Sequence, residues 1–121
     1  MDVVFMKPSD IRFSKEFIPA RFSNCEEING VIAKLTLHPK LLNTIPMIVV
    51  SNRNNGEWHS QNNRRLYMFR VLERNGILDK IQVEISNRII VPFTRDDGCH
   101  VIMIGQSKAL KHCDCKLIVL S

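Results

Sequence analysis

The sequence predicts an α+β domain in which a small mixed sheet packs against two main helices, and three observations support this class. Short β-branched runs recur along the 121-residue chain, and two longer segments show the apolar spacing of amphipathic helices. The order is strand, loop, helix, two strands, helix, strand and a β-rich tail, which is not the regular alternation of a parallel α/β sheet. The composition, 45% hydrophobic and 24% charged, is that of a globular chain with one core.

The chain is expected to open with a strand and a loop. Residues 3–6 are a short apolar run, and Pro8 ends the strand because proline restricts the residue before it. Residues 9–22 mix polar and apolar side chains, and Pro19 prevents one continuous helix. This segment is therefore interpreted as a loop with short turns.

Residues 24–35 are expected to form the first helix. Ser23 and Glu26 have the spacing of a capping box, in which two side chains bond free N–H groups of the first turn. The apolar residues that follow have helical spacing: Ile28, Val31, Ile32 and Leu35. Residues 38–43 are expected to add a further turn.

A hairpin and the second helix follow. Residues 45–51 are a β-branched run typical of a buried strand, and 57–60 can pair with it because 52–56 are rich in turn-forming Asn and Gly. Residues 61–75 carry the strongest helical pattern in the chain, and Gly76 stands at the C-cap position.

The rest of the chain is rich in strand patterns. In residues 81–85 apolar and polar side chains alternate, which predicts a half-buried strand. Three more runs, 89–93, 101–104 and 117–120, are expected to be strands, and a turn over 94–98 favours a second hairpin between the first two.

The charge favours an anionic partner. Seventeen Lys and Arg against twelve Asp and Glu give a net charge of +5, which suits a nucleotide or nucleic acid. The basic excess is concentrated between residues 51 and 80. No apolar run approaches the roughly 20 residues that cross a bilayer, and a signal-peptide pattern is absent. We therefore expect an intracellular protein, cytoplasmic or nuclear, with no membrane partner.

The four cysteines, Cys25, Cys99, Cys113 and Cys115, are interpreted as reduced, idle thiols, as suits an intracellular chain. The alternative is a zinc site formed by Cys99, His112, Cys113 and Cys115, because thiolates and imidazoles are the preferred ligands of zinc. The single residue between Cys113 and Cys115 is shorter than the usual zinc knuckle, so no metal site is predicted.

The start of the second helix is the candidate binding site. Asn62 or Asn63 is expected at the N-cap, with Arg64 and Arg65 in the first turn, where the helix dipole disfavours cations unless an anion is near. Free backbone N–H groups and two guanidiniums make a phosphate site. The alternative is that both arginines are solvated or pair with acids such as Glu57 or Glu84. Base stacking on a bound nucleotide is assigned to Trp58 or Tyr67.

Residues 3–86 resemble the ParB/sulfiredoxin-like domain in the order and spacing of their elements. The segment Ile45-Pro46 before Met47-Ile-Val-Val50 is similar to the Pro-Ile-x-Val strand of the family, and Asn62-Asn63-Arg64-Arg65 keeps the two basic positions of its helix motif. The resemblance implies a phosphate-containing ligand, with a nucleotide and Mg²⁺ as the implied cofactors. Residues 87–121 would then be a β-rich extension packed on the same domain.

The departures from the family motifs leave open whether the protein is an enzyme. Asn63 stands where ParB proteins have Glu and sulfiredoxins have the nucleophilic Cys, so neither chemistry carries over intact. A nuclease or nucleotide hydrolase would need a relocated carboxylate, for which Asp10 and Glu16 are candidates.

The other alternative is a binding module that has no enzymatic activity. It would bind nucleic-acid backbone through a basic surface that includes Arg53, Arg64, Arg65, Arg70 and Arg74. It could also bind proteins, with residues 117–120 as a homodimer contact.

Overall fold

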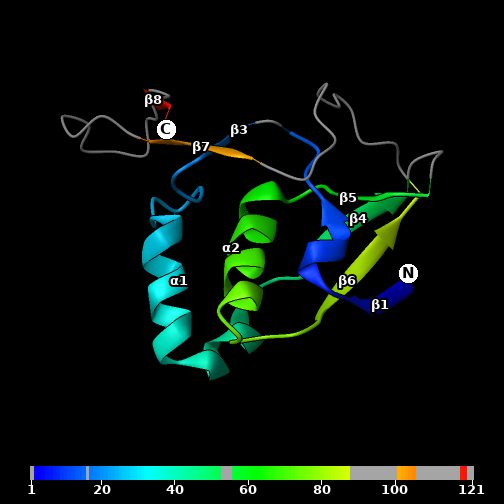
Figure 1. The fold of residues 1–121 in the computed structure, drawn as a ribbon, viewed down its shortest axis with the longest axis horizontal. Helices are drawn as coiled ribbons and strands as arrows, with labels where there is room; N and C mark the ends of the chain where they lie inside the picture. The colour runs from blue at the N-terminus through cyan, green and yellow to red at the C-terminus, as the bar shows by residue number, and fades with distance from the viewer. Residues whose placement is uncertain (1, 16, 53–55, 88–100, 106–117, 120–121) are drawn as a thin grey trace.

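The computed structural model describes residues 2–15, 17–52, 56–87, 101–105 and 118–119, and it has the predicted α+β class (Figure 1). Its elements in chain order are β1 (Asp2–Met6), η1 (Pro8–Asp10), β2 (Ile11–Arg12), β3 (Phe17–Pro19), α1 (Ile28–Leu37), η2 (Pro39–Thr44), β4 (Ile48–Asn52), β5 (Trp58–Ser60), α2 (Asn63–Arg74), β6 (Ile81–Ser86), β7 (Ile102–Gly105) and β8 (Ile118–Val119).

A mixed five-stranded sheet has the order β1-β6-β4-β5-β2. The predicted hairpin of β4 and β5 is confirmed as an antiparallel pair. β4 and β6 run parallel, and the chain passes through β5 and α2 between them. Figure 1 shows α2 between α1 and this sheet. One face of the sheet and the facing sides of both helices therefore bury a common core, with Val83, Leu66 and Leu35 among its members.

A second sheet has the order β3-β7-β8. It pairs a strand from the N-terminal part of the chain with two strands from the C-terminal part. β3 runs parallel to β7, and β8 pairs antiparallel with β7. Ile18 on β3 and Met103 on β7 are both buried and belong to the common core. The described part of the C-terminal region is thus packed on the rest of the molecule. The expected strand 89–93 and its turn lie outside the described residues.

The interpretation of residues 9–22 as loop and turns alone was wrong. The segment also contains β2, which pairs parallel with β5, and β3, which pairs with β7. Two or three residues are too few to show an alternating pattern. Both strands form because they hydrogen-bond to strands far away in the sequence, β5 and β7. The local sequence does not reveal these partners.

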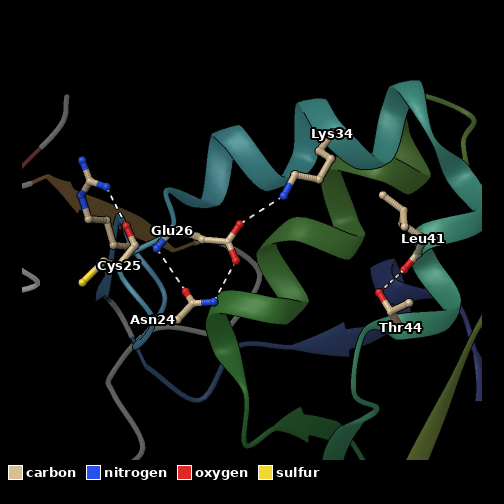
Figure 2. A network of polar contacts seen from close by, with 7 residues as sticks. Asn24, Cys25, Glu26, Lys34, Leu41 and Thr44 are labelled. Carbon is tan, nitrogen blue, oxygen red and sulfur yellow. Dashed lines mark hydrogen bonds and ion pairs between the residues drawn. The ribbon is translucent and has the colours of Figure 1, made fainter.

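The start predicted for the first helix was also wrong, because α1 begins only at Ile28 and no side chain caps it. Residues 22–26 form a tight turn instead, in which Cys25 has a φ of +73° that cannot continue a helix. Figure 2 shows the polar contacts that stabilise this turn: Asn24 Oδ1 accepts a hydrogen bond from the Glu26 N–H and Asn24 Nδ2 donates to the Glu26 carboxylate, which also pairs with Lys34. Glu26 thus binds Asn24 and Lys34 rather than capping with Ser23.

Cys25 is disulfide-bonded, so the prediction of idle thiols was wrong at this residue. Cys99, Cys113 and Cys115 lie outside the described residues, as does His112 of the alternative zinc site. Spacing in the sequence says nothing about which cysteines meet, because disulfide formation depends on the distance between Cα atoms in the folded chain.

The end predicted for the second helix is confirmed. Gly76 has a φ of +77°, and the N–H of Ile77 donates to the Leu72 carbonyl, closing a Schellman motif. Within the described segments, no helix has both the length and the apolar character needed to span a membrane.

Candidate anion-binding site at the start of helix α2

A pocket of about 320 Å³ lies at the N-terminus of α2. The loop before α1 and the turn into α2 form its walls, with the lining residues Lys15, Phe17, Ile18, Pro19, Phe22, Ser23, Gln61, Asn62, Asn63, Arg64 and Arg65. Its volume is at the lower end of the range of small-molecule sites. The tertiary structure thus brings all four predicted binding residues, 62–65, to one cavity.

The helix start is tied to the sheet rather than capped by a side chain. Asn62 is the N-cap residue, but its Oδ1 accepts a hydrogen bond from the Val49 N–H at 2.8 Å and makes no capping bond. The first helical bond that uses its carbonyl comes from the Leu66 N–H. The N–H groups of residues 63–65 therefore have no acceptor within the helix, and they belong to residues that line the pocket.

Asn63 is a buried positioning residue. Its Oδ1 accepts from the Ser14 N–H at 2.9 Å, and its Nδ2 donates to Ser14 Oγ at 2.9 Å. Ser14 Oγ in turn donates to the Ser60 carbonyl at 2.6 Å. These bonds hold the loop that carries Lys15 against the start of α2, so the structure uses the Asn63 amide to shape the pocket.

Arg64 and Arg65 are held at the pocket by backbone carbonyls. Arg64 Nη1 donates to the Arg21 carbonyl at 2.8 Å, and Arg65 Nη1 donates to the carbonyls of Pro46 and Met47 at 3.0 and 2.8 Å. These backbone carbonyls carry no formal charge, so the contacts do not neutralise either guanidinium. Among the ion pairs of the described residues, none includes either arginine.

Among the ion pairs of the described residues, none joins Arg64 or Arg65 to either of the acids expected as their partners. Glu57 lies 3.4 Å from the Arg12 guanidinium, and Glu84 lies on β6. Burial lowers the pKa of Arg65 below its usual value, and the adjacent charge of Arg64 lowers it further. Both causes disfavour the charged form of Arg65, and a negative charge nearby would act in the opposite direction.

The loop before α1 supplies contributions that the sequence did not indicate. Lys15 adds a third cation to the lining, and Phe17 and Phe22 add aromatic surface. No acidic side chain is among the described residues that line the pocket. Lys15 could not be identified in advance, because its place depends on the hydrogen bonds that Ser14 makes with α2.

Other predicted site residues lie elsewhere. Trp58 on β5 and Tyr67 on α2 are partly buried against the core and are not among the lining residues. Asp10 is exposed at the end of η1, and Glu16 lies outside the described residues.

Two arginines of the proposed basic surface have different environments. The Arg70 guanidinium donates to the carbonyls of Pro8 and Ile11 and lies 4.7 Å from the centre of the Phe13 ring, so it joins α2 to the N-terminal segment. Arg74 is exposed in the last turn of α2. Arg53 lies outside the described residues.

The described residues contain no group of three or more His, Cys, Asp or Glu side chains placed to hold a metal ion. Comparison of the chain with protein-family models and with curated proteins found no match. The pocket at the start of α2 is therefore interpreted from its own geometry and charge.

Proposed function

We propose that this protein binds a phosphate-containing ligand, a nucleotide or the end of a nucleic acid, in the pocket at the start of α2. The supporting observation is that Lys15, Arg64 and Arg65 line one cavity whose described lining has no acidic side chain. The three side chains are cationic hydrogen-bond donors, and a phosphate group supplies the matching negative charge and acceptor oxygens. The resemblance of residues 3–86 to the ParB/sulfiredoxin-like domain supports the same ligand class.

The arginines have donors to spare for such a ligand. A guanidinium has five N–H donors, and the hydrogen bonds to carbonyls in the described part of the chain use only Nη1 of Arg64 and Nη1 of Arg65. The carbonyls fix each side chain before a ligand arrives, so little rotamer freedom is lost on binding. The N–H groups at the helix end supply further donors.

The proposed role is binding without hydrolysis. Asn63 occupies the position of the family's catalytic residue, and both ends of its amide are hydrogen-bonded to Ser14. An amide carries no negative charge for Mg²⁺, unlike the Glu of the ParB motif, and it is not a nucleophile, unlike the Cys of the sulfiredoxin motif. A nucleotide would bring its own Mg²⁺, and Phe17 and Phe22 offer aromatic surface for a base.

Thermal unfolding with added ligands tests this proposal. Inorganic phosphate, pyrophosphate, nucleoside mono- and triphosphates, and oligonucleotides with and without a 5′-phosphate form the panel. A ligand at 100 times its Kd stabilises the folded state by about 2.7 kcal/mol. We expect that stabilisation to disappear in the double variant Arg64→Ala, Arg65→Ala.

The matched control is Arg74→Ala with Lys80→Ala, which removes the same charge from two exposed positions away from the pocket. It should retain the stabilisation by ligand. No shift with any member of the panel at millimolar concentration would contradict the proposal. An equal loss in both double variants would show that only net charge matters.

A further inference from the structure

We propose that the disulfide bond of Cys25 is a redox switch that sets the affinity of the pocket at the start of α2. Cys25 is disulfide-bonded and lies in the tight turn of residues 22–26 before α1 (Figure 2). Phe22 and Ser23 of the same turn line the pocket. One short segment therefore carries both a reducible bond and a wall of the ligand site. The inference deepens the proposed function and rests on it.

Hydrogen bonds connect this turn to a ligand-binding arginine. Nη1 of Arg21 donates to the Cys25 carbonyl at 2.7 Å, and Nη2 of Arg21 pairs with the Glu27 carboxylate at the same distance. The carbonyl of Arg21 in turn accepts a hydrogen bond from Nη1 of Arg64 at 2.8 Å. This carbonyl is the acceptor that holds Arg64 at the pocket, so a shift of the turn changes where its guanidinium lies.

The backbone of Cys25 is strained in the conformation that supports these contacts. Its φ is +73°, and among the described residues no other non-glycine residue has a positive φ. An L-residue keeps such an angle only where the surrounding structure holds it, and the disulfide is a covalent constraint of this kind. Without the disulfide, the turn adopts the conformation shown in Figure 2 for a smaller fraction of the time, and the apparent affinity of the pocket falls in proportion.

Reduction is a thiol–disulfide exchange with a dithiol. Cys25 is half-buried, so a thiolate of the reductant can reach its Sγ atom. Attack on Sγ breaks the S–S bond and releases the partner cysteine as a thiolate, and the second thiol of the reductant then releases Cys25. The disulfide of the protein gains two electrons and takes up the two protons of the dithiol, while the dithiol becomes a disulfide.

Isothermal titration calorimetry of the full chain with pyrophosphate, before and after reduction with dithiothreitol, tests the switch. We expect the Kd to be at least about threefold higher in the reduced chain, because the Arg64 side chain is then held less firmly before binding. Circular dichroism verifies that the reduced chain is folded. Mass spectrometry after thiol alkylation verifies that Cys25 has changed its redox state and identifies its partner cysteine.

Two variants separate the Cys25 disulfide from any effect of reductant on the other cysteines. Cys25→Ser removes the disulfide and should bind pyrophosphate as weakly as the reduced chain, with or without reductant. Cys25→Gly also removes it but accepts a positive φ at low cost, so it should bind more tightly than Cys25→Ser. A Kd unchanged by reduction, a reduced chain that is unfolded, a response to reductant in Cys25→Ser, or equal Kd values of the two variants would overturn the inference alone. No binding in either redox state would overturn the proposed function as well.

Discussion

Ser14 and Asn63 form a closed pair of hydrogen bonds beneath the candidate pocket. Both side chains are buried, and each provides the partner that the other requires. The orientation of the Asn63 amide follows from these bonds, since Oδ1 must face the Ser14 N–H and Nδ2 must face Ser14 Oγ. At the residue scale, the pocket therefore depends on a side chain that does not need to contact the ligand.

Replacement of Asn63 by alanine tests this role. Asn63→Ala leaves the buried Ser14 N–H without an acceptor, and an unsatisfied buried polar group costs about 1–3 kcal/mol. Urea unfolding should show a loss of that size. The control is Asn29→Ala at an exposed position of α1, which should change stability by less than about 0.5 kcal/mol. Equal effects of the two substitutions would contradict the structural role of Asn63.

At the scale of elements, the ends of the two helices are determined by different kinds of information. α2 ends where its sequence predicts, because Gly76 adopts a positive φ at low cost. α1 begins where the preceding turn allows, because Cys25 is held at a positive φ and the Ile28 N–H donates to the Ala20 carbonyl at 2.9 Å. The end of α2 therefore depends on a local sequence signal, whereas the start of α1 depends on contacts made by the preceding turn.

Two glycine substitutions should have opposite effects on stability. Gly76→Ala meets no atom within 4 Å, so its cost is the backbone strain of a left-handed residue, about 1–2 kcal/mol. Gly30→Ala lies within α1, where the nearest atom to the new Cβ is Glu27 Cβ at 3.8 Å, an ordinary contact. Alanine there should stabilise the protein by about 0.5–1 kcal/mol through helix propensity.

Thermal or urea unfolding of the two glycine variants measures the change in the free energy of unfolding that each substitution causes. If Gly76→Ala is neutral, the C-cap geometry is wrong. If Gly30→Ala is destabilising, the packing of α1 near Glu27 is tighter than the structure shows.

At the scale of the whole molecule, the two sheets share one core. Met103 on β7 and Ile18 on β3 pack with residues of α1, α2 and the five-stranded sheet. A shared core predicts that both sheets unfold in one cooperative transition.

The single tryptophan provides the measurement. Trp58 lies on β5 in the five-stranded sheet, and its fluorescence reports the unfolding of that sheet. Met103→Ala removes buried apolar volume from the three-stranded sheet and should lower the Trp58-detected stability by about 2–4 kcal/mol. Met47→Ala, at a residue that is 40% exposed, is the matched control and should cost much less. An unchanged Trp58 transition in Met103→Ala would indicate independent unfolding of the two sheets.

The sequence by itself determined the α+β class, the β4–β5 hairpin, helix α2 with its C-cap at Gly76, and the proposal of an anion site at residues 62–65. Each of these follows from local signals: apolar periodicity, turn residues, a glycine directly after a helical pattern, and cations at a helix start.

Only the tertiary structure decided the short strands β2 and β3, the start of α1, and the addition of Lys15 to the pocket with Asn63 held by Ser14. These features arise from hydrogen bonds between residues far apart in the chain, such as the 49 positions that separate Ser14 from Asn63. A hydrogen bond of this kind exists only when both partners are already positioned by packing, so no local pattern encodes it.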